Sequence, residues 1–153
     1  MKKHFLFLCF LIYLTACQPP NSSPTQSNKP LTQITLKAIG NTMEDMDFDL
    51  KTLKVPANSR IQLKLVNKGT APGMLHNIVF VKDGTADKVG TAAINLPNQN
   101  FVPDIPDVLA ASPLARPGET VTIEFDSPPI GRYQYICTYP GHHVKMRGIL
   151  MVH

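Results

Sequence analysis

Several features that mark common protein classes are scarce or missing in this sequence. Of its 153 residues none is tryptophan and only three are cysteine, at positions 9, 17 and 137. Three cysteines are too few for a disulfide-rich scaffold. No run of like charge occurs and the formal net charge is only +4, so binding to nucleic acid is not expected. There is no internal repeat, and no apolar run is long enough to span a bilayer as an ordinary helix.

The first residues have the pattern of an export signal. Lys2 and Lys3 precede a short apolar run over residues 5–14, which is followed by the small residues of Leu14-Thr-Ala-Cys17. This order of features is typical of a secretory signal peptide. The Leu-Thr-Ala-Cys sequence also resembles a bacterial lipobox, in which Cys17 is acylated and becomes the new N-terminus. We expect residues 1–16 to be a lipoprotein signal peptide; the alternative is a plain signal peptide that leaves Cys17 without a role.

Residues 17–30 are expected to be the lipidated Cys17 and a disordered tether. The segment contains four prolines among Ser, Asn, Gln and Thr, and it has no apolar side chains to bury. A coil of this length would hold a domain roughly 20 Å from a membrane, although it could equally be a leader with no spacing role. The expected location is outside the cytoplasm, lipid-anchored to a bacterial membrane and facing the periplasm or the cell exterior. Gln18 after the cysteine favours the outer membrane if the cell has two.

The remaining residues, 31–153, are enough for one domain with one core. Residues 32–39, 60–66 and 120–125 alternate apolar and polar side chains, which is typical of strands. Turn-forming residues separate these segments at 67–70 and 117–118. Many short strands broken by Gly and Pro predict an all-β Greek-key sandwich. Residues 85–94 are the exception, because they indicate a short helix capped by Thr85.

The chemistry is concentrated near the C-terminus. A thiol, an imidazole and a thioether occur within ten residues, in Cys137-Thr-Tyr-Pro-Gly-His142-His-Val-Lys-Met146, and a second imidazole, His76, lies far upstream. Each residue alone is more often packing or turn chemistry than a ligand. Two His, one Cys and a weak axial Met form the ligand set of a blue-copper site. Once Cys9 is removed and Cys17 acylated, Cys137 is an exported thiol without a disulfide partner, and a metal would occupy it.

The ligand loop and its surroundings resemble the azurin and auracyanin group of cupredoxins. The similarity is carried by residues 131–148, by Met74-Leu-His76-Asn77, and by residues 101–109 and 118–125. The resemblance implies a cupredoxin-like sandwich that binds one type 1 copper through His76, Cys137, His142 and Met146. It further implies that Asn77 holds the ligand loop through Thr138 and sends its backbone N–H toward the thiolate. The competing interpretation of Asn77 is a polar turn residue.

The resemblance also implies a docking patch around the exposed edge of the C-terminal His. Here the patch would comprise Met74, Tyr139, Pro140, Gly141 and Lys145, with Met46 as a less certain member; alternatively these residues merely close the sandwich end. Azurins have Gly where this chain has Leu75, so no fifth ligand is assumed. Lys145 replaces an apolar residue of azurins and should make the surface more basic.

Three classes of function follow from such a site. The first is a monomeric electron carrier that docks transiently with a cytochrome c, or with a partner of the oxidase or reductase type. The second is a copper-binding or delivery protein with no redox partner. An enzyme is not expected, because multicopper enzymes need further His-rich sites, and only His143 and His153 are spare once residues 1–16 are removed. Successive side chains in an extended loop point apart, so His143 is expected on the surface.

Overall fold

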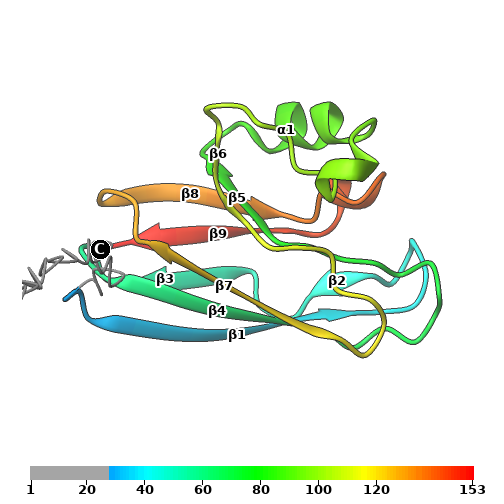
Figure 1. Cartoon of the computed structure of the whole chain (residues 1–153), viewed down its shortest axis with the longest axis horizontal. Helices are drawn as coiled ribbons and strands as arrows, with labels where there is room; N and C mark the ends of the chain where they lie inside the picture. The colour runs from blue at the N-terminus through cyan, green and yellow to red at the C-terminus, as the bar shows by residue number, and fades with distance from the viewer. Residues whose placement is uncertain (1–27) are drawn as a thin grey trace, which may run out of the picture.

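A computed structural model describes residues 28–153; the expected signal peptide, Cys17 and most of the expected tether lie outside the described residues. The described chain forms two packed sheets (Figure 1), and the predicted β-sandwich is confirmed. The first sheet has the order β2-β1-β4-β7, built from Asp47–Phe48, Leu31–Ile39, Arg60–Asn67 and Thr120–Asp126. The second has the order β3-β9-β8-β5-β6, built from Thr52–Val55, Arg147–Val152, Gly131–Ile136, Val79–Lys82 and Val108–Ala111.

The strand registers place the alternating side chains as the sequence predicts. β1 lies parallel to β4 with Leu31 opposite Arg60, and β4 lies antiparallel to β7 with Leu63 opposite Ile123. Because side chains alternate across a strand, Ile61, Leu63 and Leu65 of β4 all point inward and are fully buried. These pairings join the three strands predicted from alternation into one sheet.

Most of the core lies between the sheets, and its members include Leu36, Phe48, Val55, Phe80, Tyr135, Cys137, Met146 and Leu150. A second, smaller core lies on the outer face of the second sheet and consists of Val79, Val81, Ala86, Val89 and Ile136. Strand β5 is therefore buried on both faces. This explains why Val79-Phe80-Val81 is a continuous apolar run rather than an alternating one.

The helix over the second core is α1, Ala86–Ala93, which agrees with the helix predicted at 85–94. Thr85 occupies the N-cap position, but its side chain makes no capping bond. Its hydroxyl instead donates to the carbonyl of Lys82 at 2.8 Å, so the predicted cap interaction is wrong. Two short 3-10 turns complete the elements, η1 at Pro97–Gln99 and η2 at His142–Val144.

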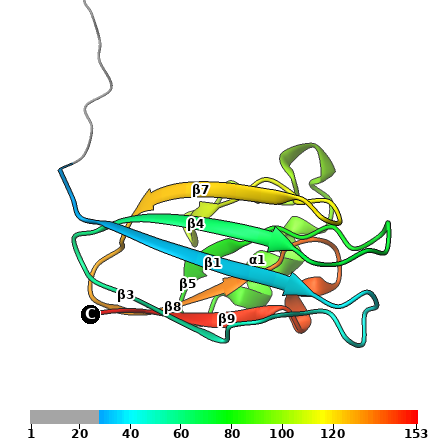
Figure 2. The ribbon, with the colours of Figure 1, turned by 90° about the horizontal axis from the view of Figure 1, so that it is seen from below.

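Both ends of the described chain, residues 28–153, lie at the end of the sandwich opposite the ligand loop (Figures 1 and 2). Strand β1 starts at the end where β9 finishes, and the loop from β8 to β9 turns at the other end (Figures 1 and 2). Among residues 28–153, no helix has the length and apolar character needed to cross a membrane.

Candidate metal centre

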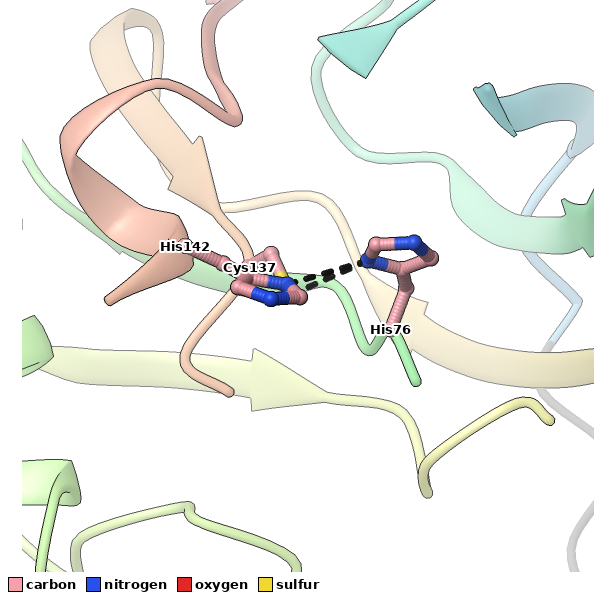
Figure 3. Close-up of side chains that lie close together, drawn as sticks. All are labelled: His76, Cys137 and His142. Atoms are coloured by element: carbon pink, nitrogen blue, oxygen red, sulfur yellow. Dashed lines mark hydrogen bonds between the residues drawn. The ribbon is translucent and has the colours of Figure 1, made fainter. Parts of the chain in front are cut away.

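Three buried side chains from separate parts of the chain meet at the loop end of the sandwich. His76, Cys137 and His142 point toward one another (Figure 3), and their potential ligand atoms all lie within 4.8 Å of each other. The two Nδ1 atoms of the imidazoles are 3.2 Å apart. The Cys137 Sγ atom lies 3.8 Å from the Nδ1 of His76 and 3.6 Å from that of His142.

The backbone fixes each of these residues independently. His76 lies between β4 and β5, where its N–H donates to the carbonyl of Ala115 at 3.1 Å and its own carbonyl accepts from Ala115 at 2.7 Å. Cys137 directly follows β8, and His142 is the first residue of η2. Because each lies at the boundary of a hydrogen-bonded element, the backbone brings the three side chains to one place.

The triangle of ligand atoms has the size that a transition metal requires. A metal bonded to two imidazole nitrogens at about 2.0 Å and a thiolate at about 2.3 Å in a trigonal plane implies edges of about 3.5 Å and about 3.7 Å. The observed nitrogen–nitrogen distance is 3.2 Å and the nitrogen–sulfur distances are 3.8 and 3.6 Å. A site with two imidazoles and one thiolate suits copper in both of its common oxidation states.

Burial shifts the protonation equilibria of all three groups. It lowers the pKa of His142 to about 4. Burial, together with the repulsion that a protonated His142 would exert, also lowers the pKa of His76 to about 4. The Cys137 pKa rises to about 12 because of burial, despite backbone N–H groups of Asn77 and Tyr139 that donate to the sulfur. Both imidazoles are thus neutral with free lone pairs, and a bound metal would have to displace the thiol proton.

Met146, the fourth expected ligand, is fully buried in the same core as Cys137. Its carbonyl accepts from the Cys137 N–H at 3.0 Å, and its N–H donates to the carbonyl of His142 at 2.8 Å. The backbone therefore connects the thioether residue to both ligands of the loop. A long, weak bond from an axial Met is what a blue-copper site needs.

Asn77 bridges the upstream segment and the ligand loop. Its Oδ1 accepts from the Thr138 N–H at 2.8 Å, and its Nδ2 donates to the Thr138 hydroxyl at 2.8 Å. The same Nδ2 donates to the carbonyl of Asn100 at 2.9 Å. Asn77 is fully buried, so it is not a solvated turn residue but a connection between three segments that surround the thiol.

Asn67 is a second buried amide that the sequence interpretation missed, because Asn67-Lys-Gly-Thr has the composition of a turn. Its Nδ2 donates to the carbonyls of Met74 at 2.7 Å and Ala115 at 3.0 Å. Its Oδ1 accepts from the Gly69 N–H at 2.9 Å. Asn67 thereby fixes both the segment that leads to His76 and the residue that pairs with it.

The residues expected to form the docking patch lie at the loop end with unequal exposure. Tyr139 and Pro140 are half-buried and Gly141 and Lys145 are exposed, whereas Met74 is only 9% exposed. Met46 is 1% exposed, so its suggested place on the surface is wrong. Instead Met43 is 47% exposed, and its Cε would lie 3.3 Å from a Cβ built on Gly141.

His143 is not on the surface as expected. It is 9% exposed, and its Nδ1 is buried without a hydrogen-bond partner. The error came from treating the loop as extended. His142 and His143 lie in the 3-10 turn η2, where successive side chains are about 120° apart. One imidazole therefore faces the site and the next faces α1.

A β-sandwich that buries two His and one Cys at one end defines the class of type 1 copper proteins, the cupredoxins. The chain belongs to the plastocyanin/azurin family of copper-binding proteins, whose family model matches residues 35–153. The predicted cofactor, one type 1 copper, is therefore confirmed.

Among curated relatives, auracyanin-A of Chloroflexus aurantiacus is 37% identical over 118 residues, which are 74% of this chain and 72% of the relative. Auracyanin-B of the same organism is 34% identical over 142 residues, 90% of this chain but only 59% of the relative. Outer membrane protein H.8 of Neisseria meningitidis is 31% identical over 111 residues, 69% of this chain and 61% of the relative.

Solved structures show the same likeness. The dithionite-reduced auracyanin of Roseiflexus castenholzii has a TM-score of 0.72 and 35% identity, and the match covers 80% of this chain and 97% of that one. Auracyanin A, described as a "blue" copper protein from Chloroflexus aurantiacus, has a TM-score of 0.72 and 32% identity. That match covers 80% of this chain and 99% of the other.

Proposed function

We propose that this protein carries single electrons between redox proteins through one copper held by His76, Cys137, His142 and Met146. The observation that carries the proposal is the triangle of two Nδ1 atoms and one Sγ inside the core. When bound, the copper supplies reversible one-electron chemistry between Cu(II) and Cu(I). A carrier needs no pocket for a substrate, and the site is closed by its own side chains.

The protein's contribution is to keep the ligands in one arrangement for both oxidation states. Backbone hydrogen bonds fix His76, Cys137 and His142, and the surrounding core would keep water from a bound copper. The backbone N–H groups of Asn77 and Tyr139 donate to the Cys137 sulfur and stabilise its thiolate form. Because little needs to move when the charge of the metal changes, electron transfer would have a low reorganisation cost.

The alternative function is copper binding or delivery without a redox partner. A delivery protein must release its metal readily, whereas here the thiol is buried and several backbone hydrogen bonds would have to break before the site opened. Two measurements separate the functions: the electron self-exchange rate of the copper protein and the rate at which Cu(I) passes to a chelator. A carrier exchanges electrons rapidly and retains copper. Slow exchange together with rapid copper loss would favour delivery.

Electrons would leave near His142, across a docking patch formed by Tyr139, Pro140, Gly141, Lys145 and the slightly exposed Met74. Small contacts of this kind suit transient redox encounters. Exposed Lys145 would favour partners with acidic surfaces and make association salt-dependent. A cytochrome c, or an oxidase or reductase with an acidic docking face, is the proposed class of partner.

The proposed location is the outside of the cell membrane, with Cys17 as a lipid anchor. Two observations support it besides the lipobox. One relative carries the name outer membrane protein. In addition, the described chain starts at the end of the sandwich opposite the ligand loop, so an anchor there would leave the copper end free for partners. Mass spectrometry of membrane-extracted protein should find a lipid-sized increment on Cys17. A soluble, unmodified mature protein would contradict the anchor.

We propose no enzymatic activity. The described residues bring together one cluster of potential ligands, His76, Cys137 and His142. Of the two remaining histidines in residues 28–153, His143 packs under α1 and His153 ends the chain. Within residues 28–153 these two histidines do not belong to a second cluster of potential metal ligands.

A further inference from the structure

The helix α1 lies outside the sandwich, yet it contacts the ligand loop at an unusual point. A Cβ built on Gly90 would lie 2.2 Å from Cγ and 2.4 Å from Cδ2 of His143. The imidazole ring of His143 therefore lies directly against the helix backbone, where only glycine leaves room for it. Glycine in the interior of a helix is unfavourable, and this contact explains its presence at position 90.

A second contact joins α1 to the same loop. The Arg147 Nε donates to the carbonyl of His143 at 2.7 Å, and its NH2 group pairs with Asp87 in the first turn of α1 at 2.6 Å. Asp87 is mostly exposed, so this ion pair alone adds little. The ion pair matters for position rather than stability, because the Arg147 guanidinium binds both Asp87 of α1 and the His143 carbonyl of η2.

The two contact residues are the immediate neighbours of two expected copper ligands. His143 follows His142, and Arg147 follows Met146. Within the loop, the carbonyl of His142 accepts from the N–H groups of Lys145 at 3.0 Å and Met146 at 2.8 Å. The loop from His142 to Arg147 is thus one compact unit, and α1 holds that unit at both ends.

We propose that α1 is a clamp on the ligand loop, in which His143 and, secondarily, Arg147 are positioning residues for His142 and Met146. This inference rests on the proposed copper function. In the proposal, the ring of His143 seated against Gly90 prevents η2 from rotating. That restraint fixes the imidazole of His142 toward Cys137 and the thioether of Met146 toward the metal. The position of the Met146 thioether, and with it the reduction potential of a bound copper, would then depend on α1.

The test compares Gly90→Ala, His143→Ala and the double variant with wild type, and uses Thr91→Ala as a control on the exposed side of α1. The apo-protein melting temperature reports on packing. The visible spectrum and reduction potential of the copper-loaded protein report on ligand position. Helix propensity alone predicts that Gly90→Ala melts higher than wild type. The clamp predicts that it melts lower, with a shifted potential and a changed charge-transfer band, because the added methyl group displaces His143.

The double variant separates the clamp from a general defect. Once the ring is absent, the contacts at 2.2 and 2.4 Å are gone and only the Cβ of residue 143, 2.7 Å from the added carbon, still has to shift. Gly90→Ala should therefore lower the melting temperature less in the His143→Ala background than in wild type. His143→Ala should itself shift the potential and spectrum, while Thr91→Ala leaves both at wild-type values. If Gly90→Ala melts at or above wild type, or if His143→Ala retains the wild-type spectrum and potential, the clamp is wrong. His143→Ala decides the matter if Gly90→Ala fails to fold. A colourless copper-loaded wild type would instead overturn the proposed function, and the apo melting temperatures would still test the helix–loop contact.

Discussion

The side chains of Asn77 and Thr138 form a reciprocal pair beside the thiol: the Thr138 N–H donates to Oδ1, and Nδ2 donates to the Thr138 hydroxyl, both at 2.8 Å. Asn77 follows His76, and Thr138 follows Cys137. The pair therefore sets the distance between the segments that carry two of the expected ligands. Because both residues are fully buried, no water replaces a lost bond.

Asn77→Ala is expected to destabilise the apo-protein by roughly 1–3 kcal/mol, because it leaves the Thr138 N–H unpaired in the core. It should also alter the potential and broaden the visible band, since the ligand loop loses its connection to His76. Chemical unfolding and a potential titration measure the two effects. The control is Asn100→Gly, which keeps the backbone carbonyl that accepts from Asn77 and tolerates the φ of 54° at this position. Loss of stability with an unchanged potential would reduce Asn77 to a packing role.

Met146→Leu should keep much of the visible colour and raise the reduction potential. Leucine fills a similar volume, so the core stays packed, but it removes the thioether that donates weakly to Cu(II). The measurement is a redox titration followed by absorption. If the potential does not change, Met146 is packing rather than a ligand.

The proposed docking patch is tested by a charge placed at Met43, beside Gly141. Met43→Glu should slow electron self-exchange at least severalfold, because both surfaces of each encounter would carry the new charge. Colour and potential should stay near wild type. The matched control is Ile130→Glu, since Ile130 is 74% exposed in the turn that precedes β8, away from the ligand loop. Equal slowing by both variants would contradict a localised patch.

Lys145→Glu should change how the rate with a redox partner depends on salt. Lys145 is exposed beside the ligand loop, and interactions of exposed charges weaken as ionic strength rises. If the wild-type rate with an acidic partner falls with salt, the variant should lose that dependence or reverse it. A parallel salt dependence in both proteins would mean that Lys145 lies outside the contact.

The apo-protein should lose stability as the pH falls from about 6.5 toward 4. In the folded state the pKa values of His76 and His142 are lowered from 6.5 to about 4, and burial also lowers the pKa of His143. The unfolded chain then binds more protons within this window, which favours unfolding. A tenfold difference in proton affinity between the two states corresponds to about 1.4 kcal/mol. Urea unfolding at pH 7.5 and pH 5 measures the loss, and His76→Gln should reduce it. Equal stability at the two values would contradict the prediction.

The sequence predicts the sandwich and the metal cluster because both follow from local patterns. Alternation identifies β1, β4 and β7, and the Cys-to-Met spacing identifies the ligand loop. The predictions that were wrong or missing concern residues whose role depends on tertiary contacts. Asn67 has the composition of a turn residue, yet its amide is buried between Met74 and Ala115. Similarly, Met43 and Met46 are the same residue type in the same short segment, but Met43 is exposed and Met46 is in the core.

Gly90 is a further residue whose role depends on a tertiary contact. In the sequence it argues against a helix, because glycine is a poor helix former. In the structure the helix is present, and His143 from a distant segment occupies the space that a side chain would need. The reason for the glycine lies far along the chain and cannot be inferred from local propensity.

The central claim is that His76, Cys137, His142 and Met146 hold one copper, with Cys137 as the thiolate. The most direct measurement is the absorption spectrum of the protein loaded with Cu(II), recorded for wild type, Cys137→Ser and His76→Ala. Wild type is predicted to show an intense blue charge-transfer band that disappears on reduction. Cys137→Ser should be colourless, and His76→Ala should have a disrupted band. A colourless Cu(II) wild type, or a blue Cys137→Ser variant, would contradict the account.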